Sequence, residues 1–255
     1  MLYGMCVGDS IERISVAARS GFDFVESCFS LLADKDDEYF ERFREVLEKY
    51  NIKCLSVNCF IPGNLKVTGP YVDYSALAEY IEKGMKRGKA IGLEKIVFGS
   101  GGARNVPDGW AYEDAYRQLI YFLKETVAPL ASKYGLTVVL EPLRRGDSNI
   151  INSAFEGAAV VSAVNADRIK CLVDLYHMET AGDDAQTVRA LKGSIKHAHI
   201  AEPVNRHYPA PGDGVDYKSF IEALEYAGCE TCAVEASTDD FNKDCAPSLP
   251  AIKAE

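Results

Sequence analysis

Short apolar runs alternate with longer amphipathic segments along the whole chain. Apolar runs of four to eight residues are typical of strands, and runs without polar alternation indicate strands that are buried on both faces, as in a parallel sheet. The pattern predicts eight strands: Leu2–Val7, Phe22–Cys28, Ile52–Cys59, Lys95–Phe98, Val138–Glu141, Cys171–Asp174, Ile195–His199 and Cys232–Glu235.

Helical spacing of apolar residues fills the intervals between these strands. The segment Glu113–Tyr134 predicts one long amphipathic helix, which Gly135 ends. Other predicted helices begin at a residue that favours the N-cap position, and the candidates are Asp9 or Ser10, Asp73, Asn152 or Ser153, Asp183 or Asp184, and Asp216. Two further predicted helices cover 36–50 and 241–252.

Strands that alternate with helices indicate a parallel sheet, and eight repeats indicate its closure into a barrel. The 255 residues match the roughly 250 that one (β/α)8 barrel needs. No linker or low-complexity segment interrupts the alternation. The sequence therefore predicts an α/β protein with one (β/α)8 TIM barrel domain over residues 1–255.

Four consecutive predicted strands end in a side chain that binds metals. They are Glu141, Asp174, His199 and Glu235, with spacings of 33, 25 and 36 residues. A strand, a helix and two loops take about 30 residues, so each side chain belongs to a separate strand–helix unit. In a closed barrel the carboxyl ends of parallel strands meet at one rim, where the chemistry of such barrels lies. We expect these four side chains to converge there.

Three carboxylates and one imidazole favour a hard divalent cation. Carboxylate-rich ligation suits Mn²⁺ or Mg²⁺, and the imidazole also admits Co²⁺, Zn²⁺ or Fe²⁺. The site stays net negative with a divalent ion, which favours a neutral polyol or carbonyl substrate. A metal there polarises a carbonyl and stabilises an enediolate, while Glu141 and Glu235 act as base and acid.

Polar residues in the following loops are candidates for substrate binding. His177 lies three residues after Asp174 and is either a group that contacts the substrate or an ordinary loop histidine. Arg206 follows the seventh strand and either binds substrate oxygens or pairs with a carboxylate of the rim. His197 shares a strand face with His199. It is expected to lie one layer deeper as support, although periodicity alone does not decide which histidine is the ligand.

The fourth predicted strand leads into Gly99-Ser100-Gly101-Gly102. The run lacks the Lys-Ser/Thr ending of a phosphate-binding P-loop, so we expect a mobile loop over the barrel mouth. Trp110, the only tryptophan, follows in the same loop. It is either a sugar-stacking residue of the lid or a packing anchor.

Charge and cysteine content narrow the class of protein. The net charge is −10 and no basic stripe is present, which argues against a nucleic acid or an anionic membrane as partner. No stretch reads as a signal peptide or a membrane span, so a cytoplasmic location is expected. The eight cysteines form no disulfide framework and are expected to be free thiols.

The second half of the chain resembles the xylose-isomerase-like barrel superfamily, most closely its ketose 3-epimerase branch, of the tagatose and psicose type. The motifs that carry the resemblance are Leu140-Glu141-Pro142-Leu143, Asp174-Leu175-Tyr176-His177-Met178, His197-Ala198-His199-Ile200, Asn205-Arg206, Pro211-Gly212-Asp213-Gly214 and Val234-Glu235. It implies a metal, usually Mn²⁺, held by the four strand-end residues. It also implies a proton shuttle between Glu141 and Glu235.

The resemblance further implies that His177 and Arg206 hold substrate oxygens. Two features depart from the family pattern. Asp147 stands where relatives often carry Glu, and the segment from His199 to Arg206 is one residue longer. Both features concern substrate binding rather than the metal.

The function expected from the sequence is metal-dependent epimerisation or isomerisation of a small sugar, with 3-epimerisation of a ketose favoured. An aldose–ketose or hydroxypyruvate-type isomerase shares the same residues. A sugar-phosphate epimerase is less favoured because Asp239 and Asp240 follow the last strand, where a phosphate would be repelled. A metal-dependent endonuclease-like hydrolase and a non-catalytic metal–polyol binding barrel are the remaining alternatives. The sequence leaves a homo-oligomer possible.

Overall fold

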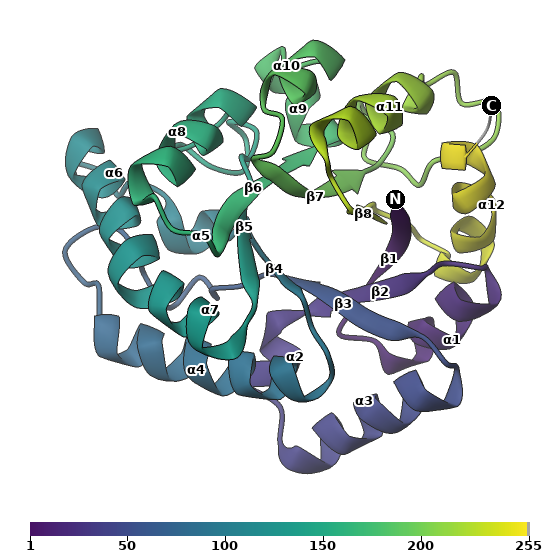
Figure 1. Ribbon diagram of the computed structural model, residues 1–255, viewed down its shortest axis with the longest axis horizontal. Coiled ribbons are helices and arrows are strands. Elements are labelled where there is room, and N and C mark those ends of the chain that lie inside the picture. Colours follow the sequence, from purple (N-terminus) through teal and green to yellow (C-terminus); the bar gives the residue numbers. More distant parts are fainter. Residues whose placement is uncertain (254–255) are drawn as a thin grey trace.

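The computed structural model describes residues 1–253 and shows the expected closed barrel of parallel strands (Figure 1). Strand order around the barrel follows the sequence, and the ring closes where Leu2 of the first strand pairs with Thr231 of the last. The strands are β1 (Leu2–Gly8), β2 (Phe24–Cys28), β3 (Lys53–Asn58), β4 (Lys95–Phe98), β5 (Thr137–Leu140), β6 (Ile169–Asp174), β7 (Ile195–Ile200) and β8 (Thr231–Val234).

Helices surround the barrel and cover its outer face (Figure 1). Those that the sequence pattern predicted are α1 (Ile11–Arg19), α3 (Asp37–Lys49), α4 (Tyr74–Ala90), α6 (Tyr112–Tyr121), α7 (Ala128–Tyr134), α8 (Ala154–Val164), α10 (Ala185–Ala190), α11 (Tyr217–Ala227) and α12 (Phe241–Lys253). Asp73, Ser153, Asp184 and Asp216 cap their helices through side-chain hydrogen bonds to backbone N–H groups, as expected.

The helices differ from the prediction in two respects. The expected helix 113–134 is present and ends at Gly135, but it contains a π-helical segment, η1 (Phe122–Val127), between α6 and α7. Pro129 lies in the first turn of α7 and has no N–H to donate to the preceding turn, so a widened turn there avoids a clash. Periodicity also missed three short helices that directly follow strands: α2 (Phe29–Ala33), α5 (Gly101–Arg104) and α9 (Leu175–Ala181).

The apolar core lies mainly between the barrel and its helices. Inside the barrel, small groups of inward-facing side chains fill the lower layers, among them Val97, Val139 and Leu172. Gly4 of β1 leaves room for the ring of Phe24, because a Cβ there would lie 2.2 Å from that ring. The barrel is therefore packed below its rim, and polar side chains are concentrated near the carboxyl ends of the strands. No helix within residues 1–253 is long and apolar enough to cross a membrane.

Candidate metal centre

The four predicted strand-end residues meet at the carboxyl end of the barrel. Glu141 follows β5, Asp174 ends β6, His199 lies in β7 and Glu235 follows β8. Each offers one potential ligand atom, and these atoms all lie within 4.8 Å of one another. Glu141, Asp174 and His199 are buried and Glu235 is partly buried. The structure thus brings together the residues that the spacing selected.

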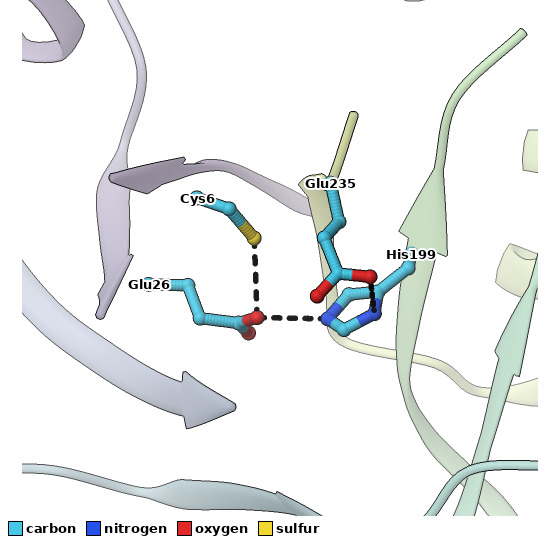
Figure 2. Close-up of side chains that lie close together, drawn as sticks. All are labelled: Cys6, Glu26, His199 and Glu235. Carbon is cyan, nitrogen blue, oxygen red and sulfur yellow. Dashed lines mark hydrogen bonds and ion pairs between the residues drawn. The ribbon is translucent and has the colours of Figure 1, made fainter. Parts of the chain in front are cut away.

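His199 lies between this cluster and a carboxylate that the sequence did not single out for a role, Glu26 of β2. The His199 Nε2 atom is 2.8 Å from Glu26 Oε1, and Nδ1 is 3.1 Å from Glu141 Oε1 and 3.3 Å from Glu235 Oε2. Figure 2 shows the imidazole between Glu26 and Glu235, with the Cys6 thiol donating to Glu26 Oε1 at 3.1 Å. Glu26 is 0% exposed, so its charge depends on these partners.

The hydrogen bonds around Glu26 assign a tautomer to both histidines. His197 Nδ1 lies 2.7 Å from the Thr231 hydroxyl and its Nε2 lies 2.8 Å from Glu26 Oε2. A neutral His197 satisfies both contacts when Thr231 donates to Nδ1 and Nε2–H donates to Glu26. Burial lowers the pKa of His197, which favours this neutral form. His197 is therefore a supporting group one layer below His199, as expected.

Glu26 acts on His199 in the same way. When Nε2–H of His199 donates to Glu26, a neutral ring directs the lone pair of Nδ1 toward Glu141 and Glu235. Burial opposes a charge on His199, but Glu26 and Glu235 outweigh it and raise the pKa of His199 well above its usual value. Positive charge, from a proton or a metal ion, is thus favoured at Nδ1.

A second group, Cys6, Glu26, His199 and Glu235, also offers four potential ligand atoms within 4.8 Å (Figure 2). Both oxygens of Glu26 already accept hydrogen bonds from Cys6 and the two histidines. Burial, reinforced by Glu26, raises the pKa of the Cys6 thiol, which keeps it protonated and a poor ligand. The strand-end group is therefore the better candidate for a hard cation.

Asp174 supplies a further observation in favour of a cation. Its Oδ1 accepts the Tyr176 N–H at 2.9 Å, whereas its buried Oδ2 has no hydrogen-bond partner among the described residues. Burial raises the pKa of Asp174 to about 6, and the charges of Glu141 and Glu235 add to this effect. Arg206 and His177 come no closer to Oδ2 than 3.6 Å, so a divalent ion among these residues would give an ionised Asp174 a closer positive partner.

Glu235 has partners on both oxygens. Asn58 Nδ2 donates to Oε1 at 2.7 Å, and the Arg206 guanidinium donates to Oε2. Although burial opposes ionisation, His199 and Arg206 together lower the pKa of Glu235 to about 2. Arg206 also lies 3.8 Å from Asp174 Oδ2, and its guanidinium is above the Tyr176 ring. In this structure Arg206 pairs with rim carboxylates, one of the two roles that the sequence left open.

Gly99 of the glycine-rich segment and Arg104 of α5 position Glu141. The backbone carbonyl of Glu141 accepts from the Arg104 guanidinium at 2.7 Å, and Arg104 is 0% exposed. A Cβ at Gly99 would lie 2.3 Å from Glu141 Oε2, so only glycine leaves space for the carboxylate. The segment expected to be a loop over the barrel mouth lines the cavity beside Glu141, and α5 begins within it at Gly101.

A cavity of about 490 Å³ lies above these residues. Glu141, Glu235, His177, Arg206 and Asp147 all line it, so three of the four residues predicted to bind substrate lie beside the cluster. The His177 Nε2 atom is 3.6 Å from Asp174 Oδ2, and Nδ1 is 3.9 Å from Asp147 Oδ2.

Trp110 is the exception among the predicted substrate-binding residues. Within the described part of the chain it is absent from the walls of this cavity, and it lines a neighbouring one of about 550 Å³ that shares only Gly102 with it. The expectation that Trp110 stacks on a substrate at the cluster is therefore not met by its position. The spacing of residues in the sequence could not predict the position of Trp110, because α5 and the turns before α6 change the direction of the loop.

Backbone strain is concentrated around the cavity. Within residues 1–253, six residues other than glycine have a positive φ, and three of these line the cavity: Cys59, Ser100 and Arg206. Such conformations cost of order 1 kcal/mol each and gather at functional sites.

The sequence pattern did not indicate Glu26, Asn58 and Arg104 as parts of the site. Glu26 is the charged residue of β2, which was a usable signal, but its histidine partners lie 171 and 173 residues away. Asn58 reaches Glu235 across 177 residues of sequence. Arg104 lies in the short helix α5, which the hydrophobic periodicity of the sequence does not predict.

The fold and this cluster define a class of protein: a (β/α)8 barrel with a carboxylate–histidine group at its carboxyl rim. The model of the xylose isomerase-like TIM barrel family matches residues 14–253, and the chain belongs to this family.

Curated relatives include epimerases and isomerases at modest identity. An L-ribulose 3-epimerase from Mesorhizobium japonicum is 31% identical over 103 residues, which are 40% of this chain and 34% of that protein. The match thus spans only about a third of that relative's length. An L-ribulose 3-epimerase from Methylomonas sp. is 26% identical over 216 residues, 84% of this chain and 73% of that protein.

Solved structures agree on the fold. The crystal structure of a D-allulose 3-epimerase from Methylomonas sp. in complex with D-allulose superposes with a TM-score of 0.83. It is 23% identical and covers 99% of this chain and 96% of that one.

Replacing Glu26 with Gln should weaken metal binding without removing a proposed ligand. The amide would place a donor against a donor of Cys6, His197 or His199, and His199 would lose its fixed tautomer. We expect Mn²⁺ affinity, measured by isothermal titration calorimetry, to fall about 10- to 100-fold. The exposed Glu230→Gln variant is the matched control, and native affinity in folded Glu26→Gln would refute this role.

Replacing Gly99 with Ala should displace the Glu141 carboxylate while leaving the fold intact. The colliding atom is the end of a flexible side chain, so Glu141 turns away and the backbone stays in place. We expect the Mn²⁺ affinity to fall about tenfold or more with a near-native melting temperature. Gly102→Ala is the control, because its Cβ would meet Gly63 Cα at an ordinary 3.5 Å. Equal affinities in the two variants would contradict the prediction.

Proposed function

We propose that this protein is a divalent-metal-dependent sugar epimerase that acts on an unphosphorylated ketose, with inversion at carbon 3 favoured. The observation that carries the proposal is the pair Glu141 and Glu235. Both line the same cavity, and both approach His199 Nδ1 within 3.3 Å, from strands that are three positions apart in the barrel. The named activities of the relatives support the same class of reaction.

The residues present fit a divalent ion. Glu141, Asp174, His199 and Glu235 would hold it through hard oxygen atoms and one imidazole nitrogen, a set that suits Mn²⁺. Asp174 Oδ2, which has no hydrogen-bond partner among the described residues, and His199 Nδ1, which faces Glu141 and Glu235, support this ligand set. When bound, the ion would supply Lewis acidity toward the substrate carbonyl.

Glu141 and Glu235 perform the proton transfer in this proposal. One carboxylate removes the proton from the carbon beside the carbonyl, and the other returns a proton to the substrate. Return to the opposite face of the same carbon gives the 3-epimer. Return to the neighbouring carbon gives an aldose–ketose isomer instead, and this alternative uses the same residues.

Three residues of the cavity wall would bind the sugar hydroxyl groups. His177 of α9 lines the cavity beside Asp174, Asp147 lies 3.9 Å from His177, and Arg206 lines the cavity beside Glu235. We propose that these three contact the substrate. Trp110 would reach only a part of the substrate that extends into the neighbouring cavity.

A free sugar fits the acidic rim better than a sugar phosphate. The loops after β7 and β8, where barrels often bind phosphate, enclose a space of about 430 Å³ lined by Asp239, Asp240 and Asp244 with Lys243. Three carboxylates against one lysine oppose a dianion. We further propose that the protein acts in the cytoplasm.

The proposal is tested by incubating free ketoses with the protein and Mn²⁺ in D₂O. We expect deuterium at the carbon beside the carbonyl, detected by NMR, together with the epimeric ketose. Glu141→Gln and Glu235→Gln should each lower turnover by about 10²- to 10⁴-fold. Glu179→Gln, on the exposed face of α9, is the matched control. Turnover without deuterium incorporation, or full turnover in both Gln variants, would contradict the proton shuttle.

A further inference from the structure

Two cysteines lie side by side at the carboxyl ends of β2 and β3. Cys28 is the last residue of β2 and pairs in register with Asn58, so Cys59 is one residue beyond its direct neighbour. The thiols of Cys28 and Cys59 influence one another, which lowers the pKa of Cys28 and raises the pKa of Cys59. Both residues are free cysteines; Cys59 is exposed and Cys28 is partly buried. A pair of this kind is within the reach of a disulfide when neighbouring strands hold the two Cα atoms less than about 7 Å apart.

Cys59 belongs to the wall of the cavity above the carboxylate cluster. It lines this cavity together with Glu141 and Glu235. Its φ of 52° is in the left-handed region, which a side chain such as cysteine rarely adopts. Asn58, the preceding residue, donates to Glu235 Oε1. A change at Cys59 is therefore transmitted through one peptide unit to a carboxylate of the cluster.

The other cysteines have different surroundings. Cys6, Cys54, Cys171, Cys229, Cys232 and Cys245 are all buried. Oxidants in solution reach an exposed thiol far more readily than a buried one. Oxidation should consequently be confined to the cavity pair.

We propose that Cys28 and Cys59 form a dithiol modification site, which hydrogen peroxide or a related two-electron oxidant converts to a disulfide. The cross-link fixes the end of β3 against the end of β2 and shifts Asn58 away from Glu235. The consequence for metal binding rests on the proposed function; the cross-link itself does not. Reduction by a thiol restores the pair.

The chemistry balances with one peroxide. The Cys28 thiolate attacks a peroxide oxygen, the O–O bond breaks, and the products are a sulfenic acid at Cys28 and one water after protonation. The sulfur of Cys59 then attacks the Cys28 sulfur, the S–O bond breaks, and the oxygen leaves as a second water with the proton from Cys59. Two thiols are oxidised and one peroxide is reduced. The neighbouring Cys59 thiol lowers the pKa of Cys28 despite its burial, in keeping with Cys28 as the attacking thiol.

The cross-link is tested by treating the native protein with hydrogen peroxide, blocking free thiols and mapping peptides by mass spectrometry without reduction. We expect a peptide pair joined through Cys28 and Cys59, its disappearance after dithiothreitol, and no such pair in Cys28→Ser. Absence of the joined pair in the native protein, or joining mainly through any other cysteine, would overturn the proposal. This readout needs neither metal nor substrate, so it stands apart from the proposed activity.

The effect on the cluster is tested by Mn²⁺ titration of the same samples. We expect oxidation to lower the Mn²⁺ affinity of the native protein about tenfold, and reduction to restore it. In Cys28→Ser the affinity should not change on peroxide treatment. A fully cross-linked native protein with unchanged Mn²⁺ affinity would refute the coupling to Glu235. Failure of both forms to bind Mn²⁺ would instead count against the proposed function.

Discussion

The buried Glu26 carboxylate, which accepts hydrogen bonds from both His197 and His199, is the interaction on which the site depends. A carboxylate that is 0% exposed is stable only when donors surround it. Burial alone would raise its pKa, but the two histidines lower the pKa of Glu26 well below its usual value. The contact ties β2 to β7 across the barrel and fixes which nitrogen of His199 faces the cluster. The arrangement of Glu141, Asp174 and Glu235 around Nδ1 follows from that choice.

Three further carboxylates, Glu141, Asp174 and Glu235, lie close together and need stabilising contacts. Arg206 and Asn58 balance Glu235, Arg104 holds the backbone of Glu141, and Gly99 gives the Glu141 carboxylate its space. Asp174 is left with one buried oxygen that has no hydrogen-bond partner in residues 1–253. A site with this remaining deficit of positive charge is suited to a divalent cation, and the same deficit opposes binding of an anionic substrate. The chemistry proposed above, proton transfer on a neutral sugar, agrees with both properties.

Much of this fold and cluster could be predicted from the sequence, because both rest on local periodicity. Eight apolar runs separated by helical segments specify a parallel barrel, and a polar residue at the end of four consecutive runs must then reach one rim. Glu26 and Asn58 could not be given roles in this way, since their partners are more than 170 residues away in the sequence. The π-helical turn before Pro129 and the short helix α5, which places Arg104 and directs Trp110 to another cavity, depend on packing that no single segment encodes.

One divalent cation is proposed to bind among Glu141, Asp174, His199 and Glu235. Anomalous diffraction from crystals soaked in Mn²⁺ measures this directly. We expect a single anomalous peak within about 2.0–2.4 Å of an atom from each of these four side chains, with Nδ1 as the ligand atom of His199. A peak between Cys6 and Glu26, or no ordered peak near Asp174 Oδ2, would contradict it.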